Sequence, residues 1–148
     1  MNIKKLLSKA IKIDEGLSRD CYIFSNFVVK IPKEGYNNDE YLLKQSLKEI
    51  EVWNEAKYTS MKSILAEIYK VIYTKDYPII IMERITPYYD LTCYHSDEVK
   101  DQLSKKTILK VNKLCEVFNL LEEDLFYPPN CGLGKTNEFK ICDYGWQI

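Results

Sequence analysis

The sequence predicts an α+β fold that begins with an antiparallel sheet crossed by one helix and continues into a smaller, mainly helical part. Residues 13–32 and 70–83 are rich in β-branched and aromatic residues and are interrupted by turn residues, as antiparallel strands and hairpins are. Between them, residues 39–57 carry apolar side chains at helical spacing. Residues 96–121 repeat that spacing, so most of the remaining helix is expected in the second half.

Length and composition indicate one globular domain. The chain has 148 residues, of which 46% are hydrophobic, enough to bury a core. We expect residues 1–85 to hold the sheet with its helix and residues 86–148 the helical part. A net charge of −1 provides no overall positive field, which argues against nucleic acid as a partner. No segment approaches the about 20 apolar residues of a membrane span, so we expect a cytoplasmic protein without a membrane partner.

The cysteines argue for free thiols rather than a metal cluster or disulfides. Five cysteines are scattered without a CxxC pair, and His95 is the single histidine that could complete a zinc site. We therefore expect reduced cysteines, no zinc, and His95 as a surface loop residue.

The N-terminal elements follow from short periodic patterns. Residues 1–12 place an apolar stripe on one side of a helix, which we expect to pack on the sheet: Ile3, Leu6, Leu7, Ala10 and Ile11. A helix on a membrane surface is the less favoured alternative. A turn at residues 14–16 and another at Ser25-Asn26 separate strands expected at 21–24 and 27–31.

The crossing helix and the elements after it are predicted in the same way. Asp39 is a plausible N-cap after a polar loop at 35–38, and the buried stripe is expected to contain Leu43, Leu47, Ile50, Trp53 and the stem of Lys57. Strands are expected at 70–73 and 77–83, followed by an extended linker at 85–87. Ser96 is a candidate N-cap for the helices that end at Leu121, and a last strand is expected at 139–142.

Lys30 lies inside a β-branched run that Pro32 closes, which is an unfavourable place for a charge without a partner. One interpretation gives Lys30 a buried carboxylate partner. The other places it on the solvent face of an edge strand, and from this strand alone both remain open.

The stretch 124–145 combines residue types that phosphoryl transfer needs. Asp124 follows the helical region, Asn130 lies in a loop, and Asp143 follows a short apolar strand. A carboxylate near the attacking hydroxyl, together with an amide and a second carboxylate for metal ions, would serve that chemistry. Asp124 could also simply end the preceding helix.

These residues occur in an order that resembles the protein kinase-like folds. Val28-Val29-Lys30 resembles the strand motif whose lysine contacts the α- and β-phosphates, and Glu49 on the following helix resembles the glutamate that pairs with this lysine. The order Asp124, Asn130, Asp143-Tyr144-Gly145 resembles the catalytic loop and the Asp-Phe-Gly motif.

The resemblance implies ATP and Mg²⁺ as cofactors and assigns a role to each residue. Lys30, held by Glu49, would orient the phosphates, with Gly16 and Ser18 in the phosphate loop. The backbone from Glu83 to Ile85 would meet adenine. Asn130 and Asp143 would hold the magnesium ions. Asp124 would orient a hydroxyl acceptor, with Glu123 as the alternate acid.

Several features depart from the family. The segment 16–22 has a single glycine, although Ser18 and Arg19 could contact phosphate in its place, and Glu122-Glu123 stand where the family has His-Arg. Three residues follow Gly145, so we expect Trp146 and Ile148 to fold back over apolar surface, without an activation segment or the helices that bind protein substrates.

Three functional interpretations follow. One is a minimal kinase-like phosphotransferase that acts on a hydroxyl acceptor. Another is a pseudokinase that binds and regulates a protein partner, as a small phage or mobile-element protein would with a host protein, and Tyr88-Tyr89 could be its binding patch or cleft-edge packing. In the third, an unrelated α+β protein, Lys30 and Asp143 are ordinary edge and turn residues. The segment 132–136 lacks the first glycine of a P-loop and is expected to be a turn.

Overall fold

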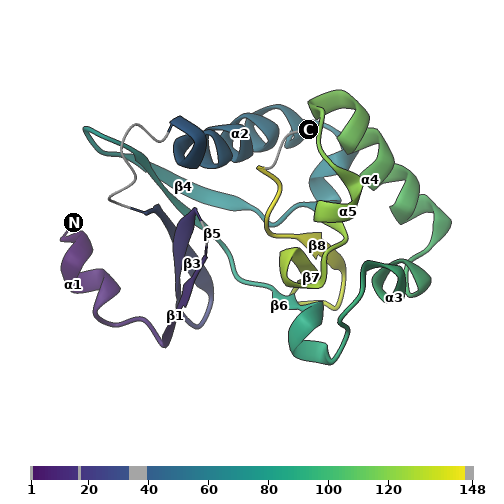
Figure 1. The fold of residues 1–148 in the computed structure, drawn as a ribbon, viewed down its shortest axis with the longest axis horizontal. Helices are drawn as coiled ribbons and strands as arrows, with labels where there is room; N and C mark the ends of the chain where they lie inside the picture. The colour runs from purple at the N-terminus through teal and green to yellow at the C-terminus, as the bar shows by residue number, and fades with distance from the viewer. Residues whose placement is uncertain (1, 17, 34–39, 146–148) are drawn as a thin grey trace.

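A five-stranded antiparallel sheet forms the first half of the chain (Figure 1). The computed structural model describes residues 2–16, 18–33 and 40–145, so the predictions for Asp39, the loop at 35–38, Trp146 and Ile148 lie outside the described residues. The strand order is β1-β2-β3-β5-β4, and the strands are β1 (Lys12–Glu15), β2 (Arg19–Ile23), β3 (Phe27–Pro32), β4 (Ile68–Tyr73) and β5 (Pro78–Glu83). The mixed α+β character that the sequence predicts is confirmed.

The two central strands, β3 and β5, are covered on both faces. Val29 and Ile79 pack toward the short helix α1 (Ile3–Leu7), whereas Ile80 and Met82 join the larger core beneath α2 (Glu40–Ala56). Successive side chains of a strand point to opposite faces. This double coverage explains why β5 reads as an unbroken apolar run.

The N-terminal helix packs on the sheet as predicted, but it is shorter than the apolar stripe suggested. Asn2 caps it by accepting a hydrogen bond from the Lys5 amide at 3.3 Å. Ile11 does not belong to the helix and is 64% exposed, because its amide donates to the Ile23 carbonyl at 2.7 Å and extends the β1–β2 ladder. The turn predicted at 14–16 is also displaced, since β1 continues to Glu15 and pairs there with Asp20.

The predicted stripe of α2 is confirmed in part, since Ile50 and Trp53 are buried, but the buried face also includes residues outside the stripe. Leu47 is 51% exposed, while Gln45 and Glu49 are buried together with Val52 and Ala56. These four buried residues share one side of the helix at spacings of three and four residues. Two polar residues occupy that side because they belong to a buried hydrogen-bond network, which apolar periodicity does not reveal.

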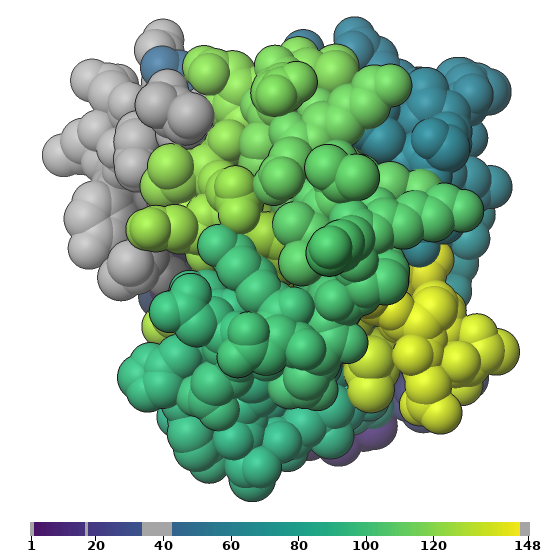
Figure 2. All heavy atoms as spheres, turned by 90° about the vertical axis from the view of Figure 1, so that its right-hand side faces the viewer, coloured from purple at the N-terminus to yellow at the C-terminus, as the bar shows by residue number. Residues whose placement is uncertain are grey.

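The second half contains short helices and a small three-stranded sheet of order β6-β7-β8. Its elements are η1 (Ser60–Ile64), β6 (Thr86–Pro87), η2 (Tyr88–Leu91), α3 (Ser96–Asp101), α4 (Lys105–Phe118), α5 (Glu122–Leu125), η3 (Pro128–Asn130), β7 (Cys131–Leu133) and β8 (Phe139–Ile141). The linker expected at 85–87 instead starts this sheet, because Thr86 pairs with Leu133. Figure 2 shows the face that α4 and the segments before it form.

The helices between residues 96 and 121 begin and end at positions only partly predicted. His95, not Ser96, is the N-cap of α3, and it is exposed as expected. The Ser104 hydroxyl caps α4 by accepting from the Thr107 amide at 3.2 Å. Asn119 ends α4 in the left-handed conformation with φ 58°. None of the helices in the described ranges combines the length and the apolar character that a membrane crossing requires.

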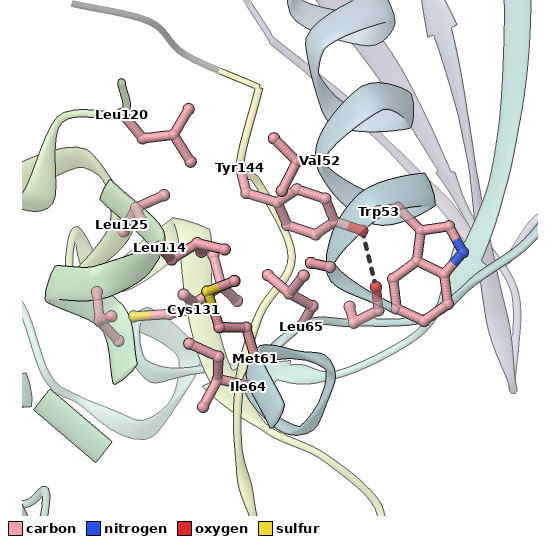
Figure 3. Close-up of a cluster of buried hydrophobic side chains, with 14 of the residues drawn as sticks. Val52, Trp53, Met61, Ile64, Leu65, Leu114, Leu120, Leu125, Cys131 and Tyr144 are labelled. Atoms are coloured by element: carbon pink, nitrogen blue, oxygen red, sulfur yellow. Dashed lines mark hydrogen bonds between the residues drawn. The ribbon is translucent and has the colours of Figure 1, made fainter. Parts of the chain in front are cut away.

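One core joins α2 to the second half of the chain (Figure 3). The ring of Tyr144 lies beside Val52 of α2, and its hydroxyl donates to the Ala66 carbonyl at 3.0 Å. Tyr144 is fully buried, so this hydrogen bond satisfies two polar atoms that water cannot reach.

Replacing Tyr144 by Phe tests this contact. The substitution leaves the Ala66 carbonyl without its donor, and we expect the free energy of unfolding to fall by about 1–3 kcal/mol. Urea denaturation measures the change. Tyr58→Phe is the matched control, because Tyr58 is 83% exposed. Equal stability of the two variants would contradict the assigned role of the hydroxyl.

Candidate functional site

A cavity of about 540 Å³ collects residues from both halves of the chain. Eight of the residues that the sequence analysis assigned to a site line it: Gly16, Ser18, Lys30, Glu83, Ile85, Asp124, Asn130 and Asp143. Glu49 lies behind Lys30 and does not reach the cavity, and Glu123 is exposed outside it. Segments more than 100 residues apart thus meet at one place.

Lys30 lies on the central strand β3, between β2 and β5, so the edge-strand interpretation is wrong. Its side chain is 5% exposed. The ammonium donates to Glu49 Oε1 at 2.7 Å and also to the backbone carbonyl of Cys142. A buried ammonium needs such partners, and the cavity offers room for an anionic third one.

Glu49 is the most enclosed charge of the site, with no exposed surface. Besides Lys30, it accepts from both terminal nitrogens of Arg19 at 3.0 and 3.3 Å and from the Tyr144 amide at 3.0 Å. Burial by itself would raise the pKa of this carboxyl, but Arg19 and Lys30 lower it to about 2. Glu49 is therefore ionised at every ordinary pH.

Arg19 is buried, with 4% of its side chain exposed, and it bridges two carboxylates. Its Nη2 lies 3.2 Å from Asp143 Oδ1, and the same guanidinium holds Glu49. Burial by itself would lower the pKa of Arg19, but the negative charges of Glu49 and Asp143 outweigh it, so the pKa lies above its ordinary value. Two carboxylates engage Arg19, which also lines the cavity, so the expectation that it contacts phosphate stays a prediction.

Ser18 and Gln45 form a chain of hydrogen bonds that ends on Asp143. The Ser18 hydroxyl donates to Gln45 Oε1, and Gln45 Nε2 donates to Asp143 Oδ1 at 2.7 Å. Gly145 lets this segment approach α2, since a Cβ there would lie 2.1 Å from the Gln45 backbone oxygen. Gln45 was missed by the sequence analysis, although it lies one helical turn before Glu49 and so shares its face.

Asn130 is held against the segment that carries Asp143. Its carbonyl accepts from the Cys142 amide at 2.8 Å and the Asp143 amide at 3.2 Å. Its side-chain amide donates to the Asp124 carbonyl at 2.8 Å. Pro128 and Pro129 stand at the start of the short 3₁₀ turn η3, which ends at Asn130.

Asp124, near the end of α5, also lines the cavity. Partial burial raises the pKa of its carboxyl, and the negative charges of Asp143 and Glu123 raise it further. A carboxylate with a raised pKa accepts a proton more readily than an ordinary aspartate does.

The cavity also has apolar walls beside its charged end. Ile23, Val28 and Ile85 line it. The side chain of Glu83 is engaged elsewhere, since it accepts from the Glu67 amide at 3.0 Å and lies 3.7 Å from Lys140. The backbone from Glu83 to Ile85, rather than the Glu83 carboxylate, is therefore what this wall can present to a ligand.

Asn130 and Asp143 lie together but do not fit the Mg²⁺ that the resemblance implies. Magnesium requires near-octahedral oxygen ligands, commonly including one or two carboxylates. Asp143 Oδ1 already accepts from Arg19 and Gln45. The structure joins none of the five cysteines, all of which lie in its described ranges, by a disulfide.

Comparison with known proteins identifies a shared fold but no family. No family model matches the chain, and no curated protein matches it. Among the solved structures that match is "High resolution (2.2 A) crystal structure of WbdD", with a TM-score of 0.60 and 12% sequence identity. The match covers 92% of this chain and 32% of the WbdD chain. This chain therefore shares the fold of about one third of that protein.

Acid unfolding of a Glu49→Gln variant tests the buried network. A folded-state pKa lowered from 4.5 to about 2 stabilises the protein fully above pH 4.5, and this stabilisation is lost as the pH falls toward 2. The difference corresponds to about 3 kcal/mol, at about 1.4 kcal/mol per pH unit. We expect Glu49→Gln to be less stable than the wild type at pH 7 and the gap to narrow by about that amount at low pH.

The measurement is the free energy of unfolding in urea between pH 2 and pH 7. Glu51→Gln is the matched control, because Glu51 lies on the same helix, is 53% exposed and pairs only with Lys48 at the surface. A gap between Glu49→Gln and wild type that stays constant with pH would contradict the buried ion pairs.

Proposed function

We propose that this chain is a kinase-like phosphotransferase that binds ATP and transfers a phosphoryl group to a hydroxyl acceptor. One observation carries the proposal: Lys30, ion-paired at 2.7 Å with Glu49 behind it, lines a cavity that Asp124, Asn130 and Asp143 also line. The distribution of these residues over the fold supports the proposal, because their order along the chain is the one that the kinase-like resemblance implies. The lysine is on a central strand, the glutamate on the crossing helix, and the other three follow in the second half.

Lys30 supplies the charge that a phosphate chain needs. Its ammonium is held by Glu49 and the Cys142 carbonyl while it still lines the cavity. A positioned cation in a partly dry site stabilises phosphate oxygens more strongly than the same cation does in water. In this proposal the apolar residues Ile23, Val28 and Ile85 receive the adenine ring next to the backbone from Glu83 to Ile85.

Asp124 is the group that accepts the proton of the attacking hydroxyl. Its carboxylate shares the cavity with Lys30, and its raised pKa suits a general base. Glu123 is exposed outside the cavity, so Asp124 is the better choice of the two acids that the sequence left open.

A second candidate function is favoured by one specific contact. Asp143 is ion-paired with Arg19 at 3.2 Å, so this carboxylate is not free as an active kinase-like site would have it. On this basis the alternative is a pseudokinase that binds ATP without transferring phosphate and regulates a protein partner.

Nucleotide binding is tested by calorimetric titration of ATP into the wild type and a Lys30→Met variant. We expect at least about tenfold weaker binding in the variant, because Lys30 loses its charge while Glu49 keeps Arg19 as a partner. Lys70→Met is the matched control, since Lys70 is an exposed lysine of β4 outside the cavity. Equal affinity of all three proteins, or no binding by any, would remove ATP from the proposal.

Phosphoryl transfer is tested by ADP release from ATP in the presence of hydroxyl acceptors: water, a sugar panel, and serine- and threonine-containing peptides. We expect Asp124→Asn to lower the rate by about 100-fold or more while ATP affinity is retained. Glu123→Gln is the control and should keep the wild-type rate. ATP binding without ADP release by the wild type would favour the pseudokinase instead.

A further inference from the structure

Arg19 occupies the position at Asp143 where a kinase-like site would use a divalent cation. We propose that the Arg19 guanidinium takes the place of that cation, so that the cavity binds its polyphosphate ligand without a divalent metal at this carboxylate. The identity of the ligand rests on the proposed function, whereas the exclusion of the metal rests on Arg19 and its contacts alone.

The guanidinium is fixed from both ends. The backbone of Arg19 is anchored in the sheet, where its carbonyl accepts from the Gly16 amide at 2.9 Å and it pairs with Pro32. At the other end, two of its nitrogens bind Glu49 at 3.0 and 3.3 Å. Rotating the side chain away would break a paired, buried contact to a carboxylate with no exposed surface, so Arg19 is a permanent part of the site.

The oxygen of Asp143 that faces Arg19 is doubly engaged. Oδ1 accepts from Arg19 at 3.2 Å and from Gln45 at 2.7 Å. Ser18 donates to the oxygen of the Gln45 amide, which turns the NH₂ group of Gln45 toward Asp143. A metal ion bound at this oxygen would have to displace two donors, one charged and one held in orientation by a third residue.

The charges of the cluster balance before any metal binds. Lys30 and Arg19 are positive, and Glu49 and Asp143 are negative, all joined by ion pairs of 2.7 to 3.2 Å. A divalent cation at Asp143 would add two positive charges beside the guanidinium and repel it. Lys30 and Arg19 both line the cavity, so they are the cations that an anionic polyphosphate would contact there. Arginine stays protonated at all working pH values, so this positive charge cannot be switched off.

Binding of Mn²⁺ tests the inference without any nucleotide. The free-ion electron paramagnetic resonance signal is followed while Mn²⁺ is titrated into the wild type, Arg19→Gln, and the double variant R19Q/D143N. We expect no saturable Mn²⁺ site in the wild type. Arg19→Gln should gain such a site and bind Mn²⁺ at least about tenfold more tightly than the wild type does. The double variant should lack this site. Arg84→Gln is the control, because Arg84 also lines the cavity but bonds to the Phe24 carbonyl and not to Asp143.

Two results would overturn the inference. One is Mn²⁺ binding by the wild type that Asp143→Asn abolishes, and the other is an Arg19→Gln variant that gains no site. Circular dichroism checks that Arg19→Gln folds. If it does not, the wild type and Asp143→Asn decide the inference. Absence of a saturable Mn²⁺ site in the wild type supports it, and Mn²⁺ binding that Asp143→Asn abolishes overturns it.

ATP titrations in EDTA and in excess Mg²⁺ extend the test to the ligand. We expect the wild-type affinity to agree within about twofold in the two conditions and that of Arg19→Gln to become at least about tenfold stronger with Mg²⁺. Tenfold tightening by Mg²⁺ in the wild type would contradict the inference. Absence of ATP binding in every condition would count against the proposed function, while the Mn²⁺ titration would still decide the role of Arg19.

Discussion

The rest of the structure depends on the buried carboxylate of Glu49. It accepts hydrogen bonds from Lys30 on β3, from Arg19 on β2 and from the Tyr144 amide beyond β8. A carboxylate with no exposed surface is stable only when its charge and its lone pairs are matched. The sheet, the crossing helix and the last described segment are therefore arranged around one ion, and the cavity lies where their charged side chains meet.

Lys30 and Arg19, the two cations that bind Glu49, have different roles in the site. Lys30 is in contact with both Glu49 and the cavity, so it can respond to a ligand while its anchor remains in place. Arg19 is committed to Glu49 and Asp143. Asp124 lies outside this ion-paired cluster, and its raised pKa follows from partial burial and from the negative charges of Asp143 and Glu123. Lys30 and Arg19 are thus held by ion pairs, whereas the Asp124 carboxylate forms no ion pair with the described residues.

Much of this site could be predicted from sequence where a residue conflicts with its surroundings. A lysine in a β-branched run left a buried partner and a solvent-facing position both open. The resemblance to kinase-like folds named Glu49 as a partner, and Lys30 is paired with it. Apolar spacing predicted only part of the inward face of α2. Ile50 and Trp53 are buried as expected, whereas Gln45 and Glu49 are turned inward by the charged groups that they contact. The pairing of Arg19 with Asp143 joins residues 124 positions apart, and no local pattern carries such information. The short strands β6 and β7 are likewise set by pairing partners and not by their own composition.

The close approach at Gly145 has a mechanical consequence. Because the position of a Cβ there would fall 2.1 Å from the Gln45 oxygen, the backbone after Asp143 touches the backbone of α2 with no side chain between them. The helix and this segment cannot slide past each other without separating, so they travel together. An outward movement of α2 would therefore displace Glu49, Gln45 and Asp143 together. The charged end of the cavity would form or separate as a unit.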